Sequence, residues 1–337
     1  MASGRPASED AAGDAAWLLR ELGGKHRSQV LSTLASVGVA DALRARGACG
    51  VAELAAETRC EPATLESLLR AAAGMGCVDE PEAGVFALTG RGEQLCSDRL
   101  GAFAGFLGSP TQWDAWSRLR EAMRDAGGAP AFERAHGRAL YEHLAADAVA
   151  AAEYDAAIDA FTRHEAGRLR GRLEAQAGQT IVDVGGGRGT LLRILLEEAA
   201  GARGVLFDLP HVVDAARPSL PANIEAVAGD FFASVPAGGD VYVLKHVLHN
   251  WSDDDARRIL ENCRAARAPG GRVVIVDAVL APDNRPDLAR MLDLEMRVLC
   301  GGRERRKPEL RRLLSSAGLT VTSAEECTEG SWLFVCV

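Results

Sequence analysis

The chain has 337 residues, of which 47% are hydrophobic and 25% are charged, an ordinary globular composition that excludes a disordered chain, a collagen-like fibre and a disulfide-stapled miniprotein. This length predicts about two domains. The net charge of −9 is opposite in sign to that of most proteins that bind nucleic acid phosphates.

The first 16 residues are rich in Ala, Ser and Asp and lack the apolar core of a signal peptide, so we expect a disordered tail over 1–16. No apolar run reaches the roughly 18 residues of a membrane helix, and we expect no membrane partner. The eight cysteines form no C-x-x-C pair. This pattern predicts reduced thiols in a cytoplasmic protein.

The segment 17–107 shows the pattern of a winged helix. Apolar residues recur at helical spacing over 29–43, and shorter helical patterns follow at 51–58, 62–76 and 91–107. Between the last two, the sequence CVDEPEAGVFALTGRG predicts a hairpin.

A winged helix can bind DNA, but it can also serve as a packing or dimerisation module. Residues 1–110 carry 14 acidic and 10 basic side chains, and the segment in the position of the recognition helix, EPATLESLLRAAAGM, has one basic residue. DNA binding requires a basic surface that this segment lacks. We therefore favour a packing or dimerisation module and expect no nucleic acid partner.

Helical patterns continue over 108–165, which holds six of the chain's 17 aromatic residues. Many of these side chains are expected to be core, although a pocket for a flat ligand would also use some of them. We expect this segment to be a helical linker that covers the substrate.

Strands and helices alternate over 166–337. The strand patterns TIVDV, GVLFDL, NIEAVAGD, DVYVLKHV and RVVIVDAVL predict a parallel sheet that is covered on both faces. The last two patterns, LTVTSAEE and WLFVCV, have no helix between them and predict an antiparallel hairpin at the sheet edge. The predicted fold class is α/β, with a mostly parallel, seven-stranded, Rossmann-like sheet.

The strongest motif is VDVGGGRG, between the first of these strands and the next helix. Glycines at such a turn let a ligand approach the backbone and the helix N-terminus. The third glycine comes one residue too early for the dinucleotide pattern G-x-G-x-x-G, which favours an adenosine ligand without a pyrophosphate. The next strand ends at Asp208, where a carboxylate can accept both hydroxyls of a ribose. The strand after it ends at Asp230, placed to bind the adenine amino group.

Of the seven histidines, only His246 and His249 follow a strand end in the α/β half, where such folds bind their ligands. A zinc pair formed by these two would lack further ligands, so we expect no metal.

Several stretches resemble the class I S-adenosylmethionine-dependent methyltransferases, and more narrowly the two-domain small-molecule O-methyltransferases of the plant caffeate type and the bacterial polyketide-tailoring type. The resemblance covers about residues 25–336. It implies S-adenosylmethionine as the cofactor, a homodimer formed through the N-terminal region, and an aromatic small molecule as the substrate. The stretches that carry it are VDVGGGRGTLL, FDLPHVV, GDFF, LKHVLHNWSDDDARRIL and GGRERRKPELRRLLSSAGL.

The resemblance also implies roles for single residues. It makes His249 the general base, oriented by Asp277 and Glu304, because a phenol with a pKa of about 10 needs a base. The implied cofactor contacts are Asp183, Gly185, Gly187, Asp208, Leu209, Asp230, Phe231, Phe232, Lys245 and Trp251. The expected substrate pocket comprises Trp113, Tyr154, Ile158, Phe161 and Met296.

Two residues depart from the family pattern. Asn250 replaces the aspartate of the family's H-D-W segment, and Glu295 stands where many bacterial relatives have a neutral polar residue, so it can meet a basic or hydroxyl-rich substrate. Few aromatic residues favour a wide, aliphatic pocket. Two alternative hypotheses stay open: a relative that binds the cofactor but catalyses hydroxylation, decarboxylation or a pericyclic step, and a winged-helix transcriptional regulator.

Overall fold

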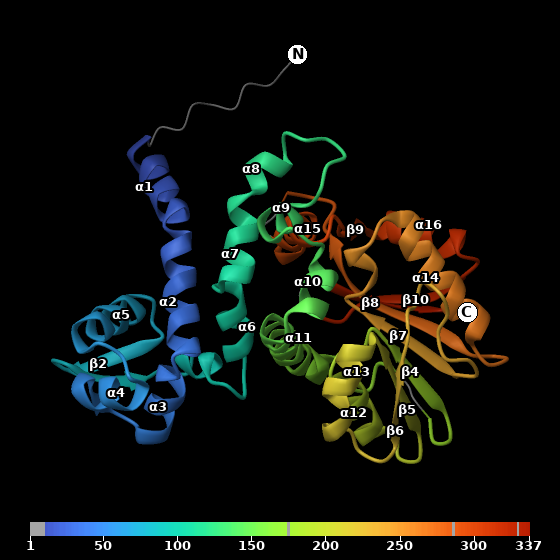
Figure 1. Ribbon diagram of the computed structural model, residues 1–337, viewed down its shortest axis with the longest axis horizontal. Coiled ribbons are helices and arrows are strands. Elements are labelled where there is room, and N and C mark those ends of the chain that lie inside the picture. Colours follow the sequence, from blue (N-terminus) through green and yellow to red (C-terminus); the bar gives the residue numbers. More distant parts are fainter. Residues whose placement is uncertain (1–10, 174–175, 285–286, 329) are drawn as a thin grey trace. The chain divides into compact units, whose positions relative to one another are not determined.

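The computed structural model describes residues 11–173, 176–284, 287–328 and 330–337. The chain forms two compact units, Met1–Ser109 and Pro110–Val337. The ribbon in Figure 1 follows both units along the sequence. Within the described residues, no helix is long and apolar enough to span a bilayer.

The first unit combines short helices with a three-stranded antiparallel sheet of order β1-β3-β2. Strands β2 and β3 form the predicted hairpin. The elements are α1 (Ala11–Leu22), α2 (Gly24–Ser36), α3 (Val39–Arg46), β1 (Cys49–Gly50), α4 (Val51–Thr58), α5 (Pro62–Gly74), β2 (Val78–Glu82), β3 (Val85–Leu88), η1 (Gly92–Leu95) and α6 (Gly101–Leu107).

Two helix predictions and the prediction of a disordered tail need correction in this unit. The pattern over 29–43 is split between α2 and α3 because Gly38 adopts a φ of 76°, which ends a right-handed helix. The pattern over 91–107 divides into η1 and α6 around an extended Cys96. The predicted tail over 1–16 is helical from Ala11, with Asp14 in the favourable first turn of α1; residues 1–10 lie outside the described part.

The second unit begins with five helices and continues into the large sheet. The longest helix, α11, runs through residue 165, where the sequence predicts a domain boundary. The helices before the sheet are α7 (Pro110–Ser117), α8 (Leu119–Ala122), α9 (Ala131–His136), α10 (Leu140–Ala146) and α11 (Ala148–Leu169).

The large sheet has the strand order β10-β11-β8-β7-β4-β5-β6, and the short strand β9 pairs with β8. Strands β4 to β8 are parallel to their neighbours, and the C-terminal hairpin β10–β11 joins β8 antiparallel, which confirms the predicted fold class. The elements are β4 (Thr180–Val184), α12 (Thr190–Glu198), β5 (Arg203–Asp208), α13 (Pro210–Ala216), η2 (Arg217–Ser219), β6 (Ile224–Ala228), β7 (Val241–Lys245), η3 (Leu248–Asn250), α14 (Asp253–Ala266), β8 (Arg272–Leu280), α15 (Leu288–Leu299), β9 (Arg305–Arg306), α16 (Lys307–Ser316), β10 (Val321–Glu326) and β11 (Ser331–Cys336).

The apolar strands of this sheet feed two cores, one on each face. Val241 and Val243 of β7 pack with residues of α12, whereas Tyr242 and Leu244 pack with residues of α14 and α16. Successive side chains of a strand point to opposite faces, so a continuous apolar run is what a sheet covered on both sides requires. Figure 1 shows α12 and α13 on one side of the sheet and α14 and α16 on the other.

Candidate active site

The carboxyl ends of five adjacent parallel strands, in the order β8-β7-β4-β5-β6, carry most of the predicted site residues. Ligands of open α/β sheets bind at these ends, where the connections leave in opposite directions. Asp183 lies one residue before the end of β4, Asp208 and Lys245 are the last residues of β5 and β7, and Asp277 lies three residues before the end of β8.

The glycine-rich turn brings Asp208 against the backbone. Its two carboxylate oxygens accept hydrogen bonds from the amides of Gly187, at 2.8 Å, and Leu209, at 2.7 Å. Gly185 and Gly187 have φ values of 72° and 57°, and a Cβ added at Gly187 would meet nothing within 4 Å. The turn therefore needs glycine for its backbone conformation, and it leaves open space beside an acidic side chain.

Asp183 is almost completely buried beneath this turn. Burial, together with the charge of Asp208, raises the pKa of Asp183 to about 7, although Lys245 acts in the opposite direction. Its Oδ2 has no hydrogen-bond partner among the described residues. A Cβ at Gly186 would lie 2.7 Å from the Asp183 carboxyl carbon, so the middle glycine is needed for close packing.

Aromatic rings form the wall beside Asp230. Phe231, Phe232 and Trp251 contact one another edge to face, and Tyr141 of α10 stacks on Trp251 at 5.5 Å. The Asp230 carboxylate accepts the amide of Phe232 at 2.8 Å. These contacts bring together four of the predicted cofactor residues with an aromatic side chain of the helical region.

His249, Asp277 and Glu304 come together as expected, and all three are buried. His249 Nδ1 lies 2.6 Å from Glu304 Oε1 and 3.9 Å from Asp277 Oδ1. When Nδ1 carries the proton and donates it to Glu304, Nε2 is free to accept a proton. This geometry has the form of a base that is oriented by carboxylates.

The loop before β9 is fitted closely to η3, which carries His249. The amide of Arg303 donates to the His249 carbonyl at 2.8 Å, and a Cβ at Gly302 would lie 2.1 Å from that oxygen. Arg305 is 3% exposed. Its guanidinium donates to the carbonyls of Leu248, at 2.8 Å, and Trp251, at 2.9 Å, and so holds both ends of the turn.

Lys245 and His246 meet a buried acid that sequence reasoning missed. Glu165 of α11 lies 2.7 Å from Lys245 Nζ and 2.9 Å from His246 Nε2. Burial lowers the pKa of His246, but Glu165 outweighs this effect and raises it to about 9. Lys245, which the resemblance assigns to the cofactor, is therefore also part of an internal ion pair.

The expected substrate residues do not form one group in the printed contacts. Phe161 lies beside Lys245 and His246, with ring distances of 5.4 Å and 5.8 Å. Met296 is buried in a helical core against which Tyr154 packs, whereas Ile158 is 39% exposed and Trp113 is half-buried on α7. Their role in substrate binding stays a prediction.

Glu295 accepts a hydrogen bond from Trp116 Nε1 at 2.7 Å. Burial raises the pKa of Glu295, against the effect of this hydrogen bond. The hydrogen bond between Trp116 and Glu295 joins α7 of the helical region to α15, the helix that precedes the loop of Glu304. Sequence reasoning singled out Glu295 but did not identify Trp116 as its partner.

The sequence predicts no further metal ligand beside His246 and His249. In the structure, however, Asp277 lies near both histidines. One nitrogen each of His246 and His249 and an oxygen of Asp277 lie within 4.8 Å of one another. However, a protonated imidazole does not bind a metal ion, and His246 is paired with Glu165 as a cation. The prediction of no metal therefore stays in place as a prediction.

Three further residues escaped sequence reasoning for different reasons. Glu165 lies in a helix without a motif, Arg305 stands in a charged run typical of a surface loop, and Tyr141 is one aromatic residue among several in the helical region. A possible signal for Glu165 was its place in an otherwise apolar helical stripe, since a buried carboxylate needs a cation nearby.

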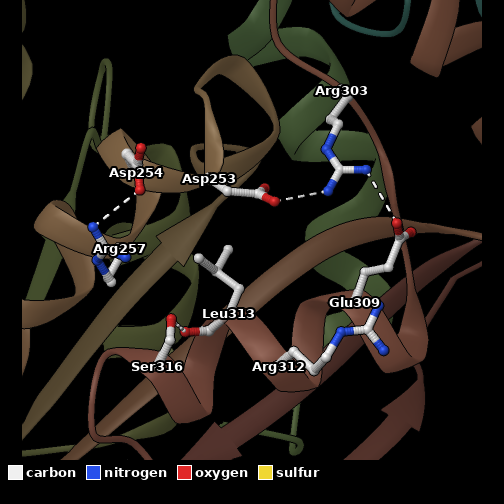
Figure 2. Close-up of a pocket in the computed structure, with 8 residues that line it drawn as sticks. All are labelled: Asp253, Asp254, Arg257, Arg303, Glu309, Arg312, Leu313 and Ser316. Carbon is white, nitrogen blue, oxygen red and sulfur yellow. Dashed lines mark hydrogen bonds and ion pairs between the residues drawn. The ribbon is translucent and has the colours of Figure 1, made fainter.

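A cavity of about 220 Å³ lies between α14 and α16, and none of its lining residues is a predicted site residue. Figure 2 shows Arg303 paired with Asp253 and Glu309, and Arg257 paired with Asp254. We assign it no ligand. It is lined by Asp253, Asp254, Arg257, Arg303, Glu309, Arg312, Leu313 and Ser316.

The strand-end residues fit an adenosine-containing cofactor. The turn offers open space above Gly187 next to the Asp208 carboxylate, and Trp251 Nε1 is a buried donor without a partner among the described residues. An acid for hydroxyl groups and an aromatic wall for a flat base are thus present at neighbouring strand ends.

Comparisons with known proteins agree with this geometry. Residues 116–320 match the model of the O-methyltransferase domain, and residues 19–98 match that of the O-methyltransferase dimerisation domain. O-methyltransferase SfmM3 of Streptomyces lavendulae is 36% identical over 322 residues, which cover 90% of this chain and 94% of that protein.

Two further relatives bear on cofactor and reaction. The crystal structure of NcsB1, an O-methyltransferase from neocarzinostatin biosynthesis in complex with S-adenosyl-L-homocysteine and 1,4-dihydroxy-2-naphthoic acid, matches with a TM-score of 0.73 and 30% identity, covering 92% of this chain and 95% of that one. Aclacinomycin 10-hydroxylase RdmB of Streptomyces purpurascens is 33% identical over 335 residues, covering 93% of this chain and 86% of that protein.

Proposed function

Because the chain belongs to the O-methyltransferase family and uses S-adenosylmethionine, we propose that it methylates a hydroxyl group of an aromatic natural product, with His249 as the general base. The observation that carries this proposal is the buried contact between His249 and Glu304, with Asp277 alongside. The cofactor supplies a methyl group on a sulfonium, and the chain's residues must orient it and remove the acceptor's proton.

The residues divide this work between them. Asp208 would hold the ribose, Asp230 the adenine amino group, and Trp251 with its neighbouring phenylalanines the adenine face. His249 would take the hydroxyl proton at Nε2 while Nδ1 donates to Glu304. The developing imidazolium is then stabilised by Glu304 and Asp277, whose carboxylates both face its Nδ1.

For the acceptor, we propose a phenolic ring that also carries an amino or hydroxyl group. NcsB1 was crystallised with an aromatic diol, which supports the phenolic part. Glu295 supports the second group, because a half-buried carboxylate that accepts hydrogen bonds from Trp116 and Gln112 still has lone pairs for a further donor.

Hydroxylation is a second candidate activity, and the similarity to RdmB, which is named a hydroxylase, favours it. Asn250 gives it some support, since the charge that accompanies the base in the H-D-W segment is absent. The side-chain amide of Asn250 donates to the His246 carbonyl at 3.2 Å. The His249, Asp277 and Glu304 arrangement favours methylation over this alternative.

We further propose that the protein is a cytoplasmic homodimer. The match to the dimerisation domain supports self-association. Helix α1 exposes four large apolar side chains that a second copy could cover: Trp17, Leu18, Leu19 and Leu22. The eight free thiols suit a reducing compartment.

The test is a mass-spectrometric screen of aminophenols and polyphenols with S-adenosylmethionine. We expect a product heavier by one methyl group, and a decrease of roughly 10²–10⁴-fold in His249→Ala with retained cofactor binding by calorimetry. Unchanged turnover in His249→Ala would exclude this residue as the base. A product that gains oxygen instead would favour hydroxylation.

A further inference from the structure

Glu165 is a buried carboxylate whose two oxygens are both engaged. It is 3% exposed. Oε2 contacts Lys245 and His246, and Oε1 accepts from Ser331 Oγ at 3.2 Å and Thr328 Oγ1 at 3.4 Å. Burial favours the protonated acid, but the charges and hydrogen bonds of His246 and Lys245 outweigh it and hold the pKa of Glu165 well below its usual range. Glu165 is therefore a charged group.

His246 connects Glu165 to the predicted base. Its Nε2 faces Glu165, while its Nδ1 lies 3.7 Å from Asp277 Oδ1. Its ring stacks on that of His249, with centroids 5.3 Å apart and an interplanar angle of 27°. The same Asp277 oxygen lies 3.9 Å from His249 Nδ1, so the two imidazoles share one carboxylate.

The backbone holds His246 in this place. Its φ of 54° lies in the left-handed region, which non-glycine residues rarely adopt. The backbone amide of His246 donates to the Val276 carbonyl at 2.8 Å, and the His246 carbonyl accepts from the side-chain amide of Asn250. Strained positions of this kind cluster at functional sites, where the surrounding structure maintains them.

The charges around His249 show what a cationic His246 does. Glu304 and Asp277 both attract a proton to His249, and Lys245 is already bonded to Glu165. His246 is the cation stacked against the base. Without the charge of His246, His249 would face two carboxylates with no cation in contact.

Several charged or titratable groups face this cluster. They are Glu165 from α11, Asp183 from β4, Lys245 and His246 from the end of β7, Asp277 from β8, Glu304 from the loop before β9, and Cys327 from the β10–β11 turn.

We propose that Glu165 is a positioning residue that acts through His246: it holds His246 as a cation, and this cation keeps His249 free to accept the proton of the acceptor hydroxyl. The proposal rests on the proposed function for the role of His249. A like charge at this separation disfavours a second positive charge on the neighbouring ring.

The first test follows the charge of His246 by NMR titration of the full-length protein labelled with ¹⁵N in histidine. It needs neither cofactor nor acceptor, so its outcome is independent of the proposed function. We expect the His246 ring to stay cationic at pH 7 in the wild type. In Glu165→Gln, which keeps the hydrogen-bonding shape but removes the charge, its titration midpoint should fall by about two pH units.

The second test is the pH dependence of kcat/KM with the acceptor found in the screen. In Glu165→Gln and in His246→Asn, the acid limb of the profile should move to higher pH by about one unit or more. Asparagine is chosen because it tolerates a left-handed backbone. Combining both changes should add no further shift, because they act on the same charge.

Asp240→Asn is the matched control, since Asp240 is a carboxylate of the same sheet that accepts the Thr180 amide at 2.8 Å, at the opposite end of the strands. Its profile should coincide with that of the wild type. The proposal is wrong if the His246 midpoint in Glu165→Gln stays within half a unit of the wild-type value, or if the acid limbs coincide. If Glu165→Gln fails to fold, the kcat/KM profile of His246→Asn tests the proposal. An acid limb that coincides with that of the wild type would contradict it.

Discussion

The Asp183 carboxyl is buried, and its Oδ2 has no hydrogen-bond partner in the described part of the chain. Its pKa of about 7 in the folded protein lies above the unfolded value of about 3.9. The folded state therefore binds this proton more tightly than the unfolded state. The stability that results is present below pH 4 and is lost as the pH rises to about 7.

Asp183→Asn removes this titration. The difference in unfolding free energy between the variant and the wild type should therefore grow, in favour of the variant, by about 2–3 kcal/mol between pH 5 and pH 8. Urea unfolding at both pH values measures it, because titrations common to both proteins cancel in the difference. A difference that does not change with pH would contradict the raised pKa.

At the level of secondary structure, the short turn η3 depends on a side chain from a distant loop. Arg305 donates to the carbonyls of Leu248, the first residue of η3, and Trp251, just after it, and to Asp253 at 2.9 Å. These bonds fix the backbone on both sides of His249. A lysine cannot reproduce them, because its single nitrogen lacks the planar fork of the guanidinium.

Arg305→Lys should lower the unfolding free energy by about 1.5–3 kcal/mol and reduce kcat for methyl transfer. The control is Arg306→Lys, a change at the exposed neighbour, which should stay within about 0.5 kcal/mol of the wild type. Equal effects of the two changes in denaturant unfolding and turnover would show that Arg305 does not hold the turn.

Features with a local signature in the sequence could be predicted, whereas features that depend on distant partners could not. The strand ends could be predicted, because apolar runs followed by glycine or acidic residues have a local signature, and parallel strands bring those ends together. The break at Gly38 escaped prediction because the apolar pattern continues across it. Glu165 and Arg305 escaped because their burial depends on partners 80 residues away for Glu165 and 57 for Arg305, which no local pattern records.

For the whole molecule, the exposed apolar face of α1 is the feature that a single chain leaves unexplained. Leu19 and Leu22 are 70% and 64% exposed, and both lie in the segment matched by the dimerisation domain. Burying such side chains between two copies is worth about 1.5–3 kcal/mol each. The proposed self-association through this face would be driven by the same apolar burial that stabilises a core.

The wild type should sediment at twice the chain mass of 35.6 kDa. The double change Leu19→Glu and Leu22→Glu should shift it to the mass of one chain at micromolar concentration, because it places charges in the apolar contact. Met123→Glu, at a residue 78% exposed in the second unit, is the control and should leave the sedimentation unchanged. A wild type that sediments as one chain would exclude the homodimer.

The division of the predicted site between strand ends and helices has an evolutionary consequence. The residues expected to bind the cofactor follow parallel strands whose packing on both faces leaves little freedom to change. Trp116 and Glu295 belong to α7 and α15, which have no strand register to preserve. Given the proposed role of Glu295 toward the acceptor, substitutions at those two helices after gene duplication would change the acceptor preference while the strand-end residues drift little. Laboratory selection for altered acceptors would therefore start most profitably from paired libraries at residues 116 and 295.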